Sequence, residues 1–108
     1  MLEVPEELRY IRGLIAQDQY IISQHAQERM AERSISEACV LEVAQSGVYE
    51  GSGSSGAFNV RGRVMRTHNQ TDDLTVAVAL KKVKRTGQVV CIVTAFWNND
   101  QNWNWRTR

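Results

Sequence analysis

The stretch from Ser23 to Ser36 places a histidine and two arginines, His25, Arg29 and Arg33, four residues apart. Imidazole exchanges protons near neutral pH. A guanidinium group can hold a phosphate through two hydrogen bonds and stabilise charge that develops on it. Because residues four apart lie on nearly the same side of a helix, the three form one cationic row. That row could supply a general acid/base and two phosphate ligands.

The same row also has a structural interpretation. Ala26 and Met30 would form the neighbouring, buried side of the helix, along which arginine stems can lie. Glu28 follows His25 by three residues, and Glu32 follows the first arginine in the same way, so surface ion pairs could form. His25 would then be a hydrogen-bonded residue that fixes the helix to the rest of the fold. Spacing alone leaves both interpretations open.

Further cationic side chains in the second half of the chain could bind nucleic acid. They are Arg61, Arg63, Lys81, Lys82, Lys84 and Arg85. The lysine-rich group could contact an RNA backbone with salt-dependent affinity, or could keep a strand end soluble and protect its edge. The two arginines share one side of an earlier expected strand, where they could hold a phosphate or face solvent.

Two more polar residues could support chemistry. His68 lies in the polar stretch RTHNQTDD, where it could be a second acid/base or simply a solvated turn residue. Alternation places Thr94 on the same strand side as the other even-numbered residues from 90 to 96. Its hydroxyl is therefore expected to form a hydrogen bond inside the fold and could orient His25.

The C-terminal tail combines Trp103, Trp105, Arg106 and Arg108. Exposed tryptophans beside arginines can stack nucleobases. The same composition suits a protein interface, with a second copy of this chain or with an antidote protein. The third possibility is that the tail folds back on its own sheet.

Composition indicates one globular domain spanning residues 1–108. Hydrophobic residues make up 43% of the chain and charged residues 23%. The apolar runs LTVAVAL and VVCIVTAFW are far shorter than the roughly 20 residues that a membrane helix needs. With no signal-peptide core at the N-terminus, we expect a cytoplasmic protein, although a module cut from a larger secreted toxin would have the same composition.

Neither a metal nor a cofactor is expected. Cys39 and Cys91 are the two cysteines, and neither has a nearby cysteine or histidine partner in the sequence. A disulfide framework or a zinc site is therefore not indicated. No acidic cluster of the metal-ligand type is evident either.

Charge is distributed unevenly along the chain. Residues 1–50 carry four arginines and nine acidic residues, a net charge of −5, whereas residues 51–108 carry nine basic and three acidic residues, a net charge of +6. The two halves could simply complement each other. Alternatively, the basic half could face an anion such as RNA.

The pattern of apolar residues predicts helices first and strands afterwards. Helices are expected over 5–18, 24–33 and 37–45, the last two capped by Ser23 and Ser36. Strands are expected over 58–67, 74–84 and 88–97, with residues 85–87 as the turn of a hairpin. Gly62 would mark a bulge or a close backbone approach.

The fold class expected is α+β, with about three N-terminal helices packed on one face of a curved antiparallel sheet of three to four strands. The helical part would span 1–47, the sheet 48–97 and the polar tail 98–108.

Three stretches of the chain resemble a family of small bacterial domains of unknown function. They are HAQERMAERSIS, ACVLEVAQSGVYE and GQVVCIVTAFW. The family hallmark is His-Ala-x-x-Arg, three residues, Arg, a Gly-like residue and Ile-Ser/Thr, with a later strand ending in Val-Thr-x-aromatic. The matching positions here are His25, Ala26, Arg29, Arg33, Ile35, Ser36, Thr94 and Phe96 or Trp97. Ser34 stands where the family more often has Gly, which costs little if its φ is negative. The resemblance covers about residues 20–97.

Such domains are similar in outline to RelE- and ParE-like toxins, many of which make a 2′-hydroxyl of RNA attack the neighbouring phosphate. The resemblance implies a metal-independent, toxin-like ribonuclease in which His25 handles protons and Arg29 and Arg33 bind phosphate. The alternative is a non-catalytic module that holds a protein or nucleic acid through the basic hairpin and the tail.

Overall fold

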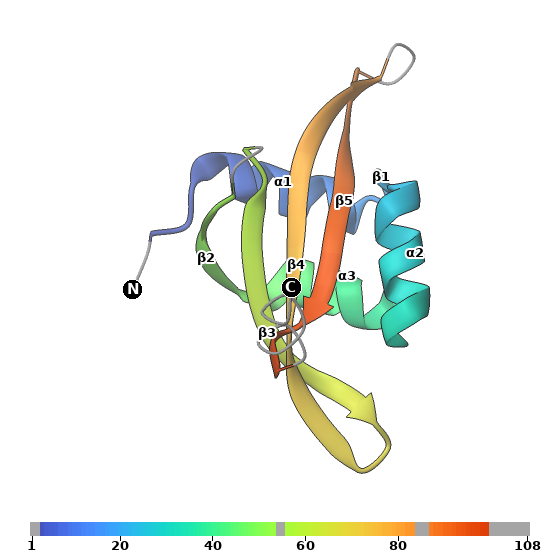
Figure 1. The fold of residues 1–108 in the computed structure, drawn as a ribbon. Helices are drawn as coiled ribbons and strands as arrows, with labels where there is room; N and C mark the ends of the chain where they lie inside the picture. Colours follow the sequence, from blue (N-terminus) through green and yellow to red (C-terminus); the bar gives the residue numbers. More distant parts are fainter. Residues whose placement is uncertain (1–2, 54–55, 84–86, 100–108) are drawn as a thin grey trace.

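The computed structural model describes residues 3–53, 56–83 and 87–99 (Figure 1). Its elements, in chain order, are α1 (Glu6–Ala16), β1 (Tyr20–Ile22), α2 (Gln24–Arg33), α3 (Glu37–Ser46), β2 (Val48–Ser52), β3 (Phe58–Thr67), β4 (Gln70–Val83) and β5 (Gly87–Trp97). The α+β class with three helices, mostly N-terminal, is confirmed. Lys84, Arg85 and the tail beyond Asn99 lie outside the described residues.

The sheet has five strands in the order β1-β5-β4-β3-β2, so the expected number of three to four strands was too low. It is also mixed rather than wholly antiparallel, because β1 pairs with β5 in parallel. The other three pairings are antiparallel, including the predicted hairpin of β4 and β5. Strands β1 and β2 have three and five residues, too few to show a clear alternation.

Serine side chains start the second and third helices as predicted. Ser23 Oγ accepts a hydrogen bond from the backbone N–H of Ala26 at 3.0 Å, and Ser36 Oγ accepts one from that of Cys39 at 3.1 Å. Each satisfies one of the free N–H groups at a helix N-terminus. The first helix ends two residues before the predicted position 18, because Asp18 adopts a left-handed conformation with φ of 61°.

The hydrophobic core lies between the helices and one face of the sheet, while none of α1, α2 and α3 lies over the opposite face (Figure 1). The sheet contributes the buried side chains of Val60, Leu74, Val76, Val78 and Ile92. The helices contribute Leu8, Ile11, Ala26, Val40 and Val43. Burial of these apolar side chains, at about 1.5–3 kcal/mol each, is the main force that holds the layers together.

Two side-chain links fix α3 against the N-terminal elements. Arg12 of α1 donates hydrogen bonds to Ala44 O at 3.0 Å and to Gly47 O at 2.7 Å, at the C-terminal end of α3. Partial burial lowers the pKa of the Arg12 guanidinium. At the other end of α3, Tyr20 donates to the Glu37 carboxylate at 2.6 Å, and this hydrogen bond raises the pKa of the Tyr20 phenol.

The third helix approaches β3 closely at two glycines. A Cβ on Gly47 would lie 2.6 Å from both Val43 O and Val60 Cγ1, distances that no real Cβ tolerates. A Cβ on Gly62 would lie 3.3 Å from Val43 Cγ2. Since the register of β3 and β4 is regular at Gly62, the close approach and not the bulge is the correct interpretation of this glycine.

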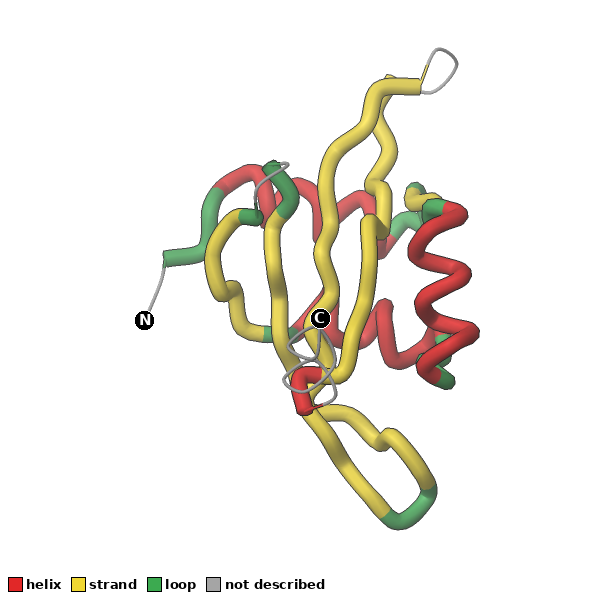
Figure 2. Tube along the Cα trace, viewed as in Figure 1, coloured by secondary structure: helices red, strands yellow, loops and turns green. Residues whose placement is uncertain are grey.

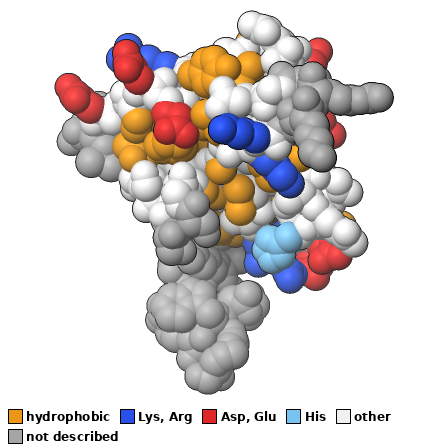
Figure 3. All heavy atoms as spheres, turned by 90° about the horizontal axis from the view of Figure 1, so that it is seen from above, with side chains coloured by type: hydrophobic (Ala, Val, Ile, Leu, Met, Phe, Trp, Pro, Cys, Tyr) orange, Lys and Arg blue, Asp and Glu red, His pale blue; other side chains and the backbone are white. Residues whose placement is uncertain are grey.

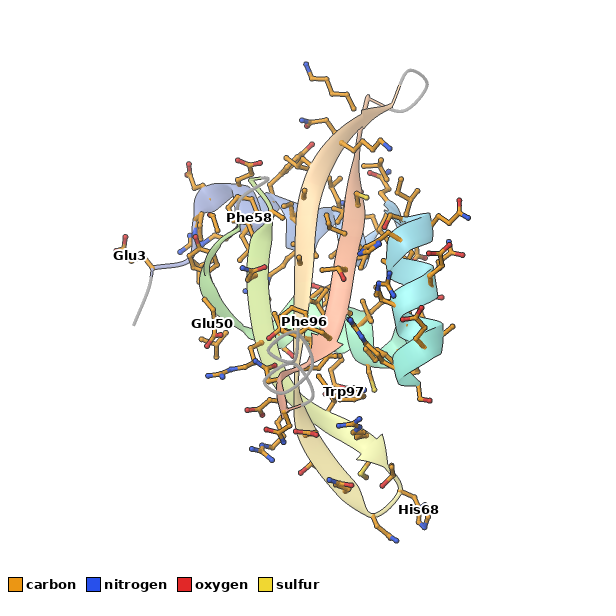
Figure 4. All side chains as sticks on the ribbon, viewed as in Figure 1. Glu3, Glu50, Phe58, His68, Phe96 and Trp97 are labelled. Carbon is orange, nitrogen blue, oxygen red and sulfur yellow. The ribbon has the colours of Figure 1, made fainter. Side chains whose placement is uncertain are left out.

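Strands β3 and β4 continue beyond the end of β5 as a two-stranded arm (Figure 2). The last pair between β4 and β5 joins Leu74 to Trp97, whereas β3 and β4 remain paired as far as Thr67 and Gln70. The arm therefore has two unpaired edges. His68 lies at its tip (Figure 4).

Substituting two glycines should move stability in opposite directions. Gly47→Ala should lower the free energy of unfolding by about 1–3 kcal/mol, because the new methyl group overlaps α3 and β3. Gly13→Ala should raise it by about 0.5–1 kcal/mol, because Gly13 lies inside α1 with open space around it. Urea denaturation of both variants measures this, and a shift of both in one direction would contradict the close approach.

Candidate functional site

The outer edge of β5 is covered first by a strand and then by a helix. Pairing with β1 ends at Ile92. From Ile92 onward, the two ends of α2 supply the hydrogen-bond donors for the edge of β5. At the first end, Ser23 N donates to Ile92 O at 3.2 Å and Ser23 Oγ donates to Val93 O at 3.3 Å. At the other end, Arg33 Nη1 donates to Ala95 O at 2.9 Å. Arg33 thus satisfies a carbonyl that a sixth strand would otherwise bind.

The side chain of Trp97 also fixes the C-terminal end of α2 to the sheet. The indole N–H of buried Trp97 donates to Arg33 O at 2.8 Å. The guanidinium of Arg66 lies over the ring of Trp97, 4.7 Å from its centroid. Ser34 then ends the helix with φ of 56°, so the assumed negative φ is wrong. Glycine would adopt this conformation with less strain than Ser34 does.

A β-bulge in β5 reverses the alternation of its side chains. Ala77 pairs with Thr94, but the next residue, Val78, pairs with Ile92, so Val93 has no partner opposite it. Such an extra residue exchanges the two faces of the strand beyond it. Thr94 therefore lies on the other face from Ile92, and its predicted place among the even-numbered core residues is wrong.

The sheet face opposite the helices is called the open face below. The register places on it side chains from the three central strands: Asn59, Arg61, Arg63, Thr75, Ala77, Thr94 and Phe96. Phe96 and Trp97 are neighbours at the end of β5 (Figure 4), but the bulge directs Trp97 into the core and Phe96 to the open face. The open face is thus polar and cationic on β3, with an aromatic side chain on β5.

The N-terminal part of the cationic row borders this face. Ala26 and Met30 pack into the core, and Arg33 reaches the β5 edge, so helical geometry places His25 and Arg29 on the side of α2 next to the open face. His25 is exposed, and no hydrogen bond or ion pair joins it to another described residue. Seen from above, a histidine and several Lys and Arg side chains lie beside a hydrophobic area (Figure 3).

Three of the predicted phosphate-binding arginines form ion pairs within the chain. The partners are Glu32 for Arg29 at 2.5 Å, Glu50 for Arg61 at 2.9 Å, and Asp73 for Arg63 at 3.4 Å. The side chains of Arg61 and Arg63 remain 43% and 65% exposed. Exposed pairs of this kind contribute about 0–1 kcal/mol, so a phosphate could displace the carboxylates at small cost.

The remaining candidates are spread over the molecule. Lys81 and Lys82 are exposed on the far part of the β4–β5 hairpin, and Lys84 and Arg85 lie outside the described residues. His68 is exposed at the tip of the arm (Figure 4). The structure therefore brings His25 and Arg29 to the border of the open face, but it leaves the hairpin lysines and His68 at separate ends of the sheet.

A buried carboxylate that the sequence did not single out lies near the base of the arm. Asp72 is 4% exposed and accepts hydrogen bonds from Arg66 Nη1 at 2.9 Å, from Asn99 Nδ2 at 2.7 Å and from the backbone N–H of Asp73 at 2.9 Å. Its stretch of sequence looked like a polar turn. The available signal was alternation along the strand, because Asp72 is in phase with the apolar residues Leu74, Val76 and Val78, which are buried.

Within ranges 3–53, 56–83 and 87–99, no group of three or more His, Cys, Asp or Glu side chains could hold a metal ion. No helix in the same part of the chain is long and apolar enough to cross a bilayer.

Two arginines one helical turn apart should differ in their effect on stability. Arg33→Met should lower the free energy of unfolding by about 1–2 kcal/mol, because it leaves Ala95 O without its charged donor. Arg29→Met removes a surface ion pair and should cost less than about 0.5 kcal/mol. Chemical denaturation compares the two, and equal losses would mean that Arg33 has no special structural role.

Two adjacent aspartates offer a second comparison. Asp72→Ala should cost about 2–3 kcal/mol, because it leaves Arg66 and Asn99 without their shared buried acceptor. Asp73→Ala removes only the long ion pair with Arg63 and should cost about 0.5 kcal/mol or less. Thermal unfolding at neutral pH measures both, and a milder effect at Asp72 than at Asp73 would contradict the assigned network.

Comparison with known proteins gives one match. No curated protein and no solved structure matches the chain. The family model for a domain of unknown function, DUF4258, matches residues 22–101, about three quarters of the chain, and includes α2, α3 and all strands except most of β1. The chain therefore belongs to the DUF4258 family of domains of unknown function.

Proposed function

We propose that this protein binds an RNA strand across the open face and cuts it without a metal, as a toxin-like ribonuclease of the RelE/ParE-like type. The observation that carries the proposal is the arrangement at the β5 border. Exposed His25 and half-buried Arg29 lie on the side of α2 next to the face that holds Thr94 and Phe96. An imidazole, a guanidinium, a hydroxyl and an aromatic ring are the groups that phosphodiester cleavage and base stacking use.

The proposed reaction is internal transfer at one phosphodiester bond. His25 takes the proton of a ribose 2′-hydroxyl, whose oxygen attacks the adjacent phosphorus and forms a 2′,3′-cyclic phosphate. The bond from phosphorus to the 5′-oxygen breaks, and that oxygen takes a proton from a water molecule as it leaves, while His25 gives the proton it holds back to solvent. Arg29 stabilises charge on the phosphoryl oxygens, while Thr94 contacts and orients the strand. Arg33, which donates to Ala95 O, holds α2 in place and acts only through it.

The basic residues of β3 and the β4–β5 hairpin would extend the RNA-binding surface. Arg61 and Arg63 lie on the open face itself, and Lys81 and Lys82 lie on the hairpin beyond it. Exchange of the carboxylate partners of Arg61 and Arg63 for phosphate would make binding weaken as salt rises. A cytoplasmic location and an antidote protein that blocks the open face would fit this function.

The second candidate is a non-catalytic module that holds RNA or a partner protein, including a second copy of this chain. One observation favours it: Arg29, Arg61 and Arg63 each have a carboxylate partner within the chain. This arrangement suits a reversible binding surface as well as it suits a catalytic one. Cleavage that depends on His25 separates the two candidates.

The test is incubation of the pure protein with RNA in the presence of EDTA. His25→Ala should lower the cleavage rate by about 100-fold or more, the usual effect of losing a general acid/base. Gln24→Ala, an exposed neighbour on the same helix, is the matched control and should cut normally. Both variants should unfold at nearly the same temperature as the unsubstituted protein.

Two results would reject the ribonuclease. One is the absence of RNA cleavage at any excess of the unsubstituted protein. The other is unchanged cleavage by His25→Ala. RNA binding without cleavage, measured by fluorescence anisotropy and weakened by substitution of Arg61 or Arg63, would support the binding module instead.

A further inference from the structure

We propose that Asp72, Arg66 and Trp97 are positioning residues of the candidate site. Together they hold the C-terminal end of α2 and thereby set where the side chain of Arg29 lies. They act on the site through the helix and are not proposed to contact RNA. The inference rests on the proposed function for its effect on cleavage, whereas the hold on α2 can be measured without RNA.

The series of contacts begins at the carboxylate of Asp72, near the base of the arm. Its Oδ1 atom accepts hydrogen bonds from Asn99 Nδ2 at 2.7 Å and from the backbone N–H of Asp73 at 2.9 Å, which fix the orientation of the carboxylate. Its Oδ2 atom accepts from Arg66 Nη1 at 2.9 Å. Hydrogen bonds between charged groups are stronger than neutral ones, so the carboxylate gives the guanidinium a defined place.

The guanidinium of Arg66 in turn fixes the ring of Trp97, which lies at the end of β5 (Figure 4). It lies over the face of the indole, 4.7 Å from the centroid, in a cation–π contact. The edge of the ring remains able to donate, and the indole N–H donates to Arg33 O at 2.8 Å. Asp72, Arg66 and Trp97, called the relay below, thus connect β4, β3 and β5 to the last residue of α2.

The relay and the side chain of Arg33 act on the same end of the helix. Arg33 Nη1 donates to Ala95 O at 2.9 Å. The arginine stem has several rotatable bonds, so this contact tolerates a shift of the helix. The indole of Trp97 is rigid and binds the helix backbone itself, at Arg33 O. The relay is therefore the contact that defines where this end of α2 lies.

The position of Arg29 depends on this end more than that of His25 does. Hydrogen bonds from Ser23 to Ile92 O and Val93 O hold the N-terminal end of α2. If the C-terminal end were released, the helix could tilt about Ser23, and each residue would move in proportion to its distance from that point. At 1.5 Å per residue, His25 is about 3 Å from Ser23 along the axis and Arg29 about 9 Å. Loss of the relay should therefore displace the guanidinium and largely spare the imidazole.

Amide hydrogen exchange at the end of α2 tests the relay without RNA. The backbone N–H of Ile35 donates to Met30 O at 2.9 Å and reports whether this end is closed. Asp72→Asn should raise its exchange rate several-fold, because a neutral amide holds the guanidinium less firmly than a carboxylate does. Asp73→Asn is the matched control and should leave the rate unchanged, since the carboxylate of Asp73 pairs with Arg63 on the open face.

A second amide separates a local effect from a general loss of stability. The N–H of Gly47 closes the end of α3 on Val43 O at 2.8 Å and takes no part in the relay. Its exchange rate should stay constant in Asp72→Asn. Equal acceleration at Ile35 and Gly47 would overturn the relay, and so would an unchanged rate at Ile35.

Trp97→Phe is a second variant that tests the same end of α2 from the other side of the relay. It keeps an aromatic ring beside Arg66 but removes the N–H that donates to Arg33 O. Exchange at Ile35 should again rise several-fold, with Gly47 unchanged. The opposite result, no change at Ile35, would overturn the relay even if Asp72→Asn does not fold.

A double-mutant cycle tests whether the relay acts on cleavage through Arg29. Asp72→Asn should lower the rate of RNA cleavage several-fold in the unsubstituted background, but by less than about twofold in Arg29→Met, where the guanidinium to be positioned is already absent. Equal losses in both backgrounds would overturn the assignment to Arg29. If the unsubstituted protein cuts no RNA while exchange at Ile35 responds as expected, the proposed function fails and the hold of the relay on α2 stands.

Discussion

The fold depends on how the outer edge of β5 is completed. The sheet needs no long sixth strand there, because a three-residue strand and then a helix cover the edge. The amide and hydroxyl of Ser23 and the guanidinium of Arg33 donate to carbonyls that a neighbouring strand would otherwise bind. Unpaired edges invite association with other chains, so these few hydrogen bonds serve both the stability and the solubility of the protein.

The same edge explains the place of the candidate site. The bulge at Val93 turns Thr94 and Phe96 away from the core just where α2 passes beside β5. Because Arg33 and Trp97 lock the C-terminal end of the helix, His25 and Arg29 are held at the border of the open face. The three residues of this motif therefore have different roles. Arg33 positions the helix, whereas His25 and Arg29 remain accessible.

The charges of the open face are balanced within the chain. Arg29, Arg61 and Arg63 each lie beside a carboxylate of the same or a neighbouring element, which keeps the net charge of the face low without an anionic ligand. Such pairs are weak in water. An anion or a partner protein could replace the carboxylates one at a time.

Local sequence by itself determined the helices, the three long strands and the serine caps, because capping, periodicity and turn chemistry act over a few residues. It also determined that His25, Arg29 and Arg33 share one side of a helix. Only the tertiary structure decided that β1 runs parallel to β5, that Thr94 lies on the open face, and that Asp72 is buried with Arg66 and Asn99. These features arise from register and from contacts between residues far apart in sequence, and a single unpaired residue such as Val93 reverses every face assignment that follows it.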